Sequence, residues 1–172
     1  MPLNVVLFQP EIPQNTGNIM RTAVGTNAKL HLIEPFGFKL DEKSLKRSHL
    51  DYGSAVDYQI YPDWETFLHL NPGNYYFLSR HGKKSPDAFD FSDPNQDFYF
   101  VFGRESTGLP KELLSANKER LLRLPMTDKI RSLNLANTVC VVLYEALRQQ
   151  GYPNLELAEP LSLKGPNWLD QD

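Results

Sequence analysis

Short apolar runs recur along the chain at the length of β-strands, separated by polar segments. They lie at residues 3–8, 30–33, 56–60, 75–79, 98–102 and 121–124. Several are apolar almost throughout instead of alternating with polar residues, which is typical of strands covered on both faces in a parallel sheet. The pattern therefore predicts a mostly parallel sheet.

Helical patterns fall between these runs. The spacing predicts a first helix that ends at Asn27 and is capped by Asn15 or Thr16. A second helix is expected from Asp63 to residue 70, and a third has Pro110 in its first turn and runs toward residue 118.

The strongest helical pattern covers residues 133–150, where apolar residues keep a spacing of three and four. Ser132 offers an N-cap for this helix, and Gly151 followed by Pro153 ends it. Because strands and helices alternate along the chain, we predict a single α/β domain with helices flanking the sheet.

The chain has 172 residues, which is the length of one domain. We expect the domain to occupy residues 1–152 and residues 153–172 to form a C-terminal tail, because the tail contains three prolines and no sustained period. The polar stretch 80–97 is long for a connection inside a domain, so we expect it to be functional or mobile.

Composition narrows the class of protein. The chain is 41% hydrophobic and 23% charged, as in ordinary globular proteins, and no apolar run approaches the roughly 20 residues of a membrane span. The single cysteine, Cys140, excludes an internal disulfide, and no cysteine and histidine spacing suits zinc. We expect a cytoplasmic protein without a membrane partner or a metal.

The net charge of −3 lacks the basic excess typical of many nucleic-acid-binding proteins. Basic residues nevertheless gather locally, where they suit either phosphate contacts or an ordinary solvated surface. The clusters are Lys39, Lys43, Lys46 and Arg47; Arg80, Lys83 and Lys84; and Lys118, Arg120 and Arg123, with Arg148 as a further candidate for phosphate contact.

A glycine loop at residues 103–108 follows a predicted strand and has the glycine spacing of a P-loop. Leu109 and Pro110 stand where a P-loop needs lysine and then serine or threonine, so a triphosphate site is excluded. The dinucleotide pattern G-x-G-x-x-G is also absent. The loop suits either the close approach of a flat ligand such as adenine or an ordinary turn.

Two helix starts carry further candidates. Asn18 and Arg21 lie three apart, and the planar guanidinium of Arg21 suits a phosphate, unless it pairs with an acid such as Glu11. Ser132 and Asn134 stand at the start of the last helix, where they bind a ligand or only cap the helix.

The order of these motifs resembles the three motifs of SPOUT-class RNA methyltransferases. The segments that match are Asn15–Thr22, Phe102–Pro110, and Leu124–Met126 with Arg131–Ala136 and Tyr144-Glu145. The opening FQPEIPQNTGN and the later LIEP are similar to the small single-domain tRNA (cytidine(34)-2′-O)-methyltransferases of the TrmL (YibK) type. The resemblance covers residues 3–152.

The resemblance implies a SPOUT fold with a C-terminal trefoil knot, an obligate homodimer and S-adenosyl-L-methionine as cofactor. It implies that Arg21 is essential and that Tyr144 contacts the partner across the dimer. The residues implied to orient the reacting groups are Asn15, Glu105, Ser132 and Asn134. It places the cofactor among three loops, at Leu78, Ser79, Gly103, Glu105, Gly108, Leu124, Met126, Ser132 and Leu133.

The implied reaction is methyl transfer to the ribose 2′-hydroxyl of the wobble nucleotide, a cytidine or a modified uridine at position 34, in the tRNA anticodon stem-loop. The group that accepts the hydroxyl proton stays open, because a guanidinium keeps its own proton. Two alternatives remain: 2′-O-methylation of another ribose in tRNA or ribosomal RNA, and a non-catalytic RNA-binding protein of the same fold.

Overall fold

The computed structural model describes residues 3–39 and 55–170. Its strands form one sheet in the order β3-β2-β1-β5-β4-β6, and every pairing is parallel. The predicted parallel sheet is confirmed, and each predicted apolar run contributes one strand. The strands are β1 (Asn4–Phe8), β2 (Lys29–Ile33), β3 (Tyr58–Tyr61), β4 (Asn74–Leu78), β5 (Phe98–Phe102) and β6 (Leu121–Leu122).

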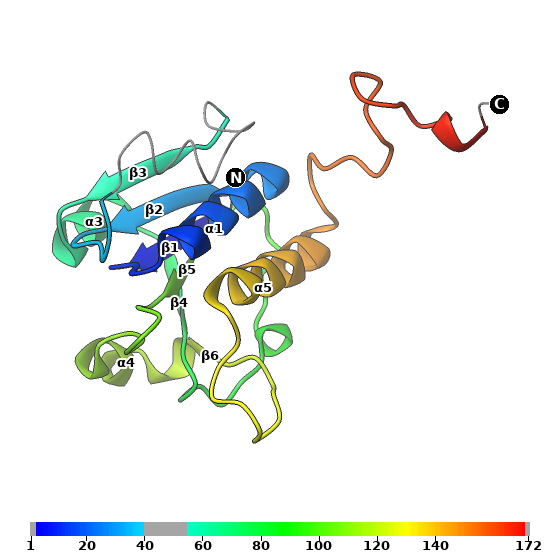
Figure 1. Ribbon diagram of the computed structural model, residues 1–172. Coiled ribbons are helices and arrows are strands. Elements are labelled where there is room, and N and C mark those ends of the chain that lie inside the picture. The colour runs from blue at the N-terminus through cyan, green and yellow to red at the C-terminus, as the bar shows by residue number, and fades with distance from the viewer. Residues whose placement is uncertain (1–2, 40–54, 171–172) are drawn as a thin grey trace.

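Helices cover both faces of this sheet (Figure 1). They are α1 (Pro13–Thr26), α3 (Trp64–Leu70), α4 (Lys111–Ala116) and α5 (Leu135–Gln150). Successive side chains of a strand point to opposite faces, so Val5 and Leu7 pack with α1 and α5. Val6 packs on the other face, with α3 and α4. Near-complete burial on both faces explains why β1 and β5 are apolar at nearly every position, whereas the edge strand β3 is exposed at three of its four positions.

The helix ends differ from the sequence prediction at two places. Helix α1 begins at Pro13 with Ile12 in the N-cap position, so neither Asn15 nor Thr16 is the cap, and both are buried residues of the first turns. Helix α5 begins at Leu135 and is capped by Asn134, so the predicted cap at Ser132 is wrong by two residues. The predicted cap at Asp63 is confirmed, since its side chain accepts a hydrogen bond from the Thr66 amide.

The connection between β4 and β5 is anchored by Phe91, which is fully buried against Tyr76, Phe98 and Phe100. The Phe91 amide donates to Gln149 Oε1 at 2.8 Å, and Gln150 Nε2 donates to the Phe91 carbonyl at 2.9 Å. The polar stretch 80–97 is therefore fixed onto the last turns of α5 by both of these side chains.

The tail leaves α5 and extends away from the sheet (Figure 1). Its leucines are largely solvent-exposed, for example Leu157, Leu161 and Leu169. The tail holds four of the 21 acidic residues and one of the 18 lysines and arginines, so it carries the whole net charge of −3.

Parallel pairing brings the carboxyl ends of the strands to one edge. Phe8 of β1 pairs with Ile33, Leu7 pairs with Phe102, and Leu78 of β4 pairs with Leu122. Loops that follow β1, β4, β5 and β6 therefore meet at this edge, which is where ligands bind in open α/β sheets.

Candidate active site

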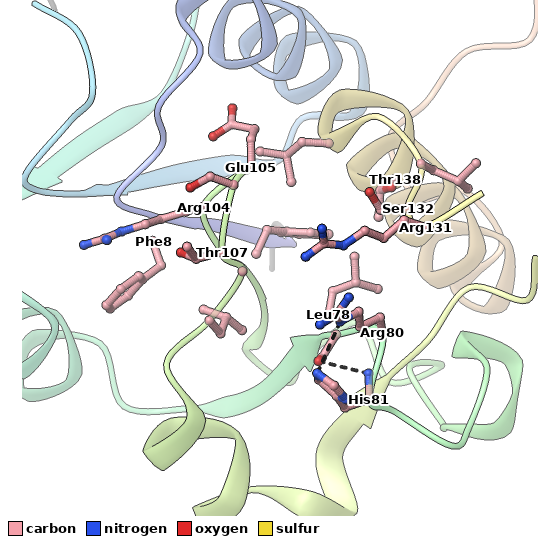
Figure 2. A pocket seen from close by; sticks show the side chains of 18 of the residues that line it. Phe8, Leu78, Arg80, His81, Arg104, Glu105, Thr107, Arg131, Ser132 and Thr138 are labelled. Atoms are coloured by element: carbon pink, nitrogen blue, oxygen red, sulfur yellow. Dashed lines mark hydrogen bonds between the residues drawn. The ribbon is translucent and has the colours of Figure 1, made fainter.

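A pocket of about 920 Å³ opens at the carboxyl edge of the sheet, between the loops that follow β1, β4, β5 and β6 (Figure 2). Every residue that the sequence analysis assigned to the cofactor lines this pocket. These residues are Leu78, Ser79, Gly103, Glu105, Gly108, Leu124, Met126, Ser132 and Leu133.

The glycine loop forms one wall and requires both of its glycines. A Cβ on Gly103 would lie 2.2 Å from the carbonyl carbon of Gly108, and Gly108 itself has a φ of +73°. Arg104 N donates to the Gly108 carbonyl at 3.2 Å, and Gly108 N donates to the Arg104 carbonyl at 2.9 Å. The result is a tight backbone turn without side-chain bulk at its base, as a flat ligand requires.

The Glu105 carboxylate points from this loop to the start of α1. It accepts hydrogen bonds from the backbone amides of Glu11 at 2.8 Å and Ile12 at 3.3 Å, and from Asn15 Nδ2 at 3.1 Å. Helix α1 has no cap from its own side chains, so Glu105 supplies acceptors and a negative charge there from far along the chain. Its carboxylate fixes the position of the loop.

Asn15 and Asn134 extend this network to α5. Asn134 Nδ2 donates to Asn15 Oδ1 at 2.9 Å, while Asn134 Oδ1 accepts from the backbone amides of Ala136 and Asn137 at 2.9 and 3.3 Å. Asn15 is only 7% exposed, so its carboxamide is satisfied within the protein. The loops that follow β1, β5 and β6 are thus joined by one chain of hydrogen bonds.

Glu11 and Ser106 form a second link between the same loops. Glu11 accepts from the Ser106 amide at 2.9 Å and from its hydroxyl at 2.8 Å. These two hydrogen bonds lower the pKa of Glu11 below its usual range. Pairing of Glu11 with Arg21, considered from the sequence, is replaced by this contact, which local sequence does not signal because 95 positions separate the partners.

Arg21 and Tyr144 lie outside the residues that line the pocket. Arg21 is exposed on α1, and Tyr144 is 46% exposed on α5. The two helices pack against each other on the same face of the sheet. Within one chain, the structure therefore groups Asn15, Glu105 and Asn134 with the predicted cofactor residues but leaves Arg21 and Tyr144 on the surface.

The pocket lining is strongly basic. Among the described residues that line it, Glu105 is the single acidic one, whereas five are lysines and arginines: Arg80, Arg104, Lys111, Arg123 and Arg131. Arg123 Nη1 donates to the Arg80 carbonyl at 2.8 Å, which holds the two basic residues at one rim. Two of the predicted basic clusters thus contribute to the pocket, whereas Lys43, Lys46 and Arg47 of the first cluster lie outside the described residues. Sequence reasoning did not single out Arg104 or Lys111.

Within residues 3–39 and 55–170, no three histidine, cysteine, aspartate or glutamate side chains gather as a metal site would require. Over the same residues, no helix has the length and apolar character to cross a membrane.

Comparison with known sequences gives a match over most of the chain. The SpoU rRNA Methylase family matches residues 2–144. A protein of Geobacillus stearothermophilus, named as a tRNA (cytidine(34)-2′-O)-methyltransferase, is 52% identical over 156 residues, which cover 90% of this chain and 99% of that relative.

Solved structures agree with this match. A structure described as giving insights into the 2-OH methylation of C/U34 on tRNA has a TM-score of 0.80 and 43% identity, covering 87% of this chain and 96% of its own. The SpoU methyltransferase AviRb from Streptomyces viridochromogenes, in complex with AdoMet, has a TM-score of 0.73 and 25% identity, covering 87% of this chain and 58% of its own.

Proposed function

Because the chain belongs to the SpoU rRNA methylase family, we propose that it transfers a methyl group from S-adenosylmethionine to the ribose 2′-hydroxyl of nucleotide 34 in tRNA. One observation carries this proposal: the three loops that the methyltransferase motifs predict meet at one pocket, in a chain 52% identical to a protein named for that reaction. The substrate is RNA, because DNA lacks the 2′-hydroxyl.

The residues of the pocket suit S-adenosylmethionine. The turn at Gly103 and Gly108 lets backbone approach the flat adenine, and Leu78, Leu124 and Met126 supply apolar contacts. When bound, the cofactor supplies an electrophilic methyl group on a positively charged sulfur. Gly103, Gly108, Leu78, Leu124 and Met126 are the residues that would hold the cofactor.

The protein's own residues then orient the ribose. The 2′-hydroxyl needs a near-attack position and a partner for its proton. We assign the essential role to Arg21 as a clamp on the phosphate next to the target ribose, because a guanidinium is a strong donor and cannot accept the proton. The Glu105, Asn15 and Asn134 network holds the first turn of α1 in place.

A homodimer completes this arrangement. Arg21 is exposed on α1, and Val141 and Tyr144 are 50% and 46% exposed on α5, so we propose that these two packed helices form the face that meets the partner. A second copy packed on this face buries these apolar side chains and brings Arg21 of one chain toward the pocket of the other. Tyr144 is then the contact across the dimer.

The trefoil knot is also part of the proposal. Two backbone hydrogen bonds join the connection between β4 and β5 to the segment around β6: Ser79 N donates to the Leu122 carbonyl, and Arg123 N donates to the Lys84 carbonyl, both at 2.9 Å. Farther along, the same connection is fixed to the end of α5 through Phe91. These contacts support passage of the chain between β6 and α5 through the loop.

Residues 1–152 form the catalytic domain in this proposal, and the tail lies outside it. The family match ends at residue 144, which supports that division. We place the enzyme in the cytoplasm, together with its tRNA substrate.

The direct test is transfer of labelled methyl from S-adenosylmethionine to tRNA by the purified protein, followed by mapping of the methylated nucleotide. Label on the ribose of nucleotide 34 is the expected result. Label on another ribose of tRNA or ribosomal RNA would support the proposed reaction but contradict the proposed substrate. Cofactor binding without transfer to any RNA pool would favour the non-catalytic RNA-binding alternative.

A further inference from the structure

Gln9 has an unusual backbone conformation at the end of the central strand β1. Its φ is +54°, in the left-handed region that residues other than glycine seldom adopt, and its amide donates to the Ile33 carbonyl at 3.0 Å. Such conformations cost free energy and are concentrated at functional sites. Gln9 also lines the pocket.

The Gln9 side chain uses both ends of its carboxamide. Nε2 donates to the Glu34 carbonyl at 3.2 Å, which ties it to the end of β2. Oε1 accepts a hydrogen bond from Arg104 Nη2. The strained residue therefore fixes the direction of the Arg104 side chain, while the turn with Gly108 fixes its backbone.

This contact holds Arg104 without neutralising it, because a carboxamide has no net charge. Within the described part of the chain, the ion pairs are Lys84–Glu119 and Arg148–Glu145, and neither includes Arg104. Both carboxylate oxygens of Glu11 accept hydrogen bonds from Ser106. These bonds, and to a smaller extent the Arg104 charge, lower the pKa of Glu11. The guanidinium keeps four further N–H donors.

Arg104 points to a different place from the other basic residues of the pocket. Figure 2 shows its side chain extending past Phe8, away from the centre of the pocket, whereas Arg131 points toward the centre from the opposite rim. A ligand that binds Arg104 therefore lies in a space that is continuous with the pocket, beyond the loops that surround the cofactor residues.

We propose that Arg104 is a binding site for a backbone phosphate of the RNA substrate, and that Gln9 is the positioning residue that presents it. A planar guanidinium matches a phosphate in a bidentate manner, and an amide partner preserves the full charge. The inference rests on the proposed RNA methyl transfer, which it deepens by assigning one contact outside the cofactor pocket.

The test measures binding of tRNA and of S-adenosylmethionine separately, over a series of salt concentrations. Arg104→Ala is expected to weaken tRNA binding about tenfold and to reduce the slope of log K against log salt by about 0.7 to 0.9, as for one lost phosphate contact. Its affinity for S-adenosylmethionine stays within twofold of wild type. Lys164→Ala removes one positive charge from the tail and serves as the matched control, with an unchanged slope.

Gln9→Glu separates positioning from simple packing. A carboxylate still accepts the hydrogen bond from Arg104 but neutralises its charge, so tRNA binding falls as far as in Arg104→Ala while the melting temperature is retained. A purely structural role predicts instead that Gln9→Glu binds tRNA like wild type, and that result would overturn the assignment of Gln9. Arg104→Lys keeps the charge and therefore restores the salt slope.

Two results would overturn the phosphate site itself: an unchanged tRNA affinity and slope in Arg104→Ala, or a loss confined to S-adenosylmethionine. These binding readouts do not require methyl transfer. A protein that fails to methylate tRNA but still binds it through Arg104 would therefore contradict the proposed function and leave the phosphate site in place.

Discussion

Asn134 donates a hydrogen bond from Nδ2 to Oδ1 of Asn15 at 2.9 Å, although 119 positions separate the two residues. The other end of the same carboxamide caps α5. One side chain therefore begins a helix and sets the position of that helix against α1. Because Ser132 and Leu133 immediately precede it, their place in the pocket depends on this contact.

Asn134→Ala is expected to lower the free energy of unfolding by about 1–3 kcal/mol, because it removes the cap of α5 and leaves Asn15 Oδ1 without its donor. Asn134→Ser retains a capping oxygen but cannot reach Asn15, so it recovers most of the stability. Urea denaturation measures this difference. Calorimetric titration is expected to show weakened S-adenosylmethionine binding in both variants, and wild-type affinity in the serine variant would contradict a role for the Asn15 contact.

Arg21→Ala is expected to reduce the rate of methyl transfer by about 100-fold or more, in the range seen when a preorganised charge-stabilising donor is removed. Affinity for S-adenosylmethionine should remain, because Arg21 does not line the pocket of its own chain. Single-turnover transfer to tRNA and calorimetric titration of the cofactor separate the two effects. Arg21→Lys preserves the charge without the planar fork and should recover only part of the rate. Unchanged turnover in the alanine variant would exclude the proposed clamp.

Gly103→Ala is expected to abolish S-adenosylmethionine binding, because its Cβ would lie 2.2 Å from backbone carbon of the same turn. Gly25→Ala is the matched control: Gly25 is exposed in the last turn of α1, and apart from the backbone of its own helix no atom lies within 4 Å of an added Cβ. It should raise the free energy of unfolding by about 0.5–1 kcal/mol. Thermal unfolding with and without cofactor measures the stability and the cofactor binding of both variants. A cofactor-induced rise in melting temperature in Gly103→Ala would show that the turn adapts.

His31 lies in the apolar layer beneath α3 and is 1% exposed. Its Nδ1 is 2.8 Å from the Tyr61 hydroxyl, and its Nε2 is 3.1 Å from Asn4 Oδ1. Burial, with a smaller contribution from the Lys29 charge, lowers the pKa of His31 from 6.5 to about 4. The imidazole is therefore neutral in the folded protein at pH 7.

This lowered pKa predicts acid sensitivity. Between pH 6.5 and about 4 the unfolded chain binds a proton at His31 that the folded chain does not bind, so stability is complete above pH 6.5 and falls as the pH decreases through this window. The loss amounts to about 3 kcal/mol in all. Urea denaturation at a series of pH values measures this loss of stability, and the His31→Gln variant should not show it. An imidazole NMR titration midpoint near 6.5 would contradict the prediction.

The strands are predictable from the sequence because burial on both faces requires apolar residues at nearly every position, as at Val5, Val6 and Leu7. The positions at which the helices begin are less predictable. Ser132 has the right chemistry for a cap, but Asn134 takes that place because it also binds Asn15, and this contact exists only in the folded chain. Asn15 also has the chemistry of a cap, but its side chain binds Glu105 and Asn134, which are distant in the sequence.

The candidate site, like the fold, is only partly predictable from the sequence. The glycine turn and Ser132, which the motifs predict as cofactor residues, line one pocket because each follows a strand or precedes a helix. The contacts Gln9–Arg104 and Glu11–Ser106 each join residues 95 positions apart, so no local pattern indicates them. Likewise, the stretch 80–97 appears polar in sequence, yet Phe91 anchors it in the core.

The place of β1 in the middle of the sheet affects how the chain is made. Asn4 pairs with Lys29 on one side and with Tyr99 on the other. A ribosome adding about 5–20 residues per second produces β5 roughly 5–20 s after β1. Throughout that interval the nascent protein exposes one apolar edge of its first strand. Chaperones that bind apolar segments are therefore expected to engage the chain at Asn4–Phe8 before β5 is made.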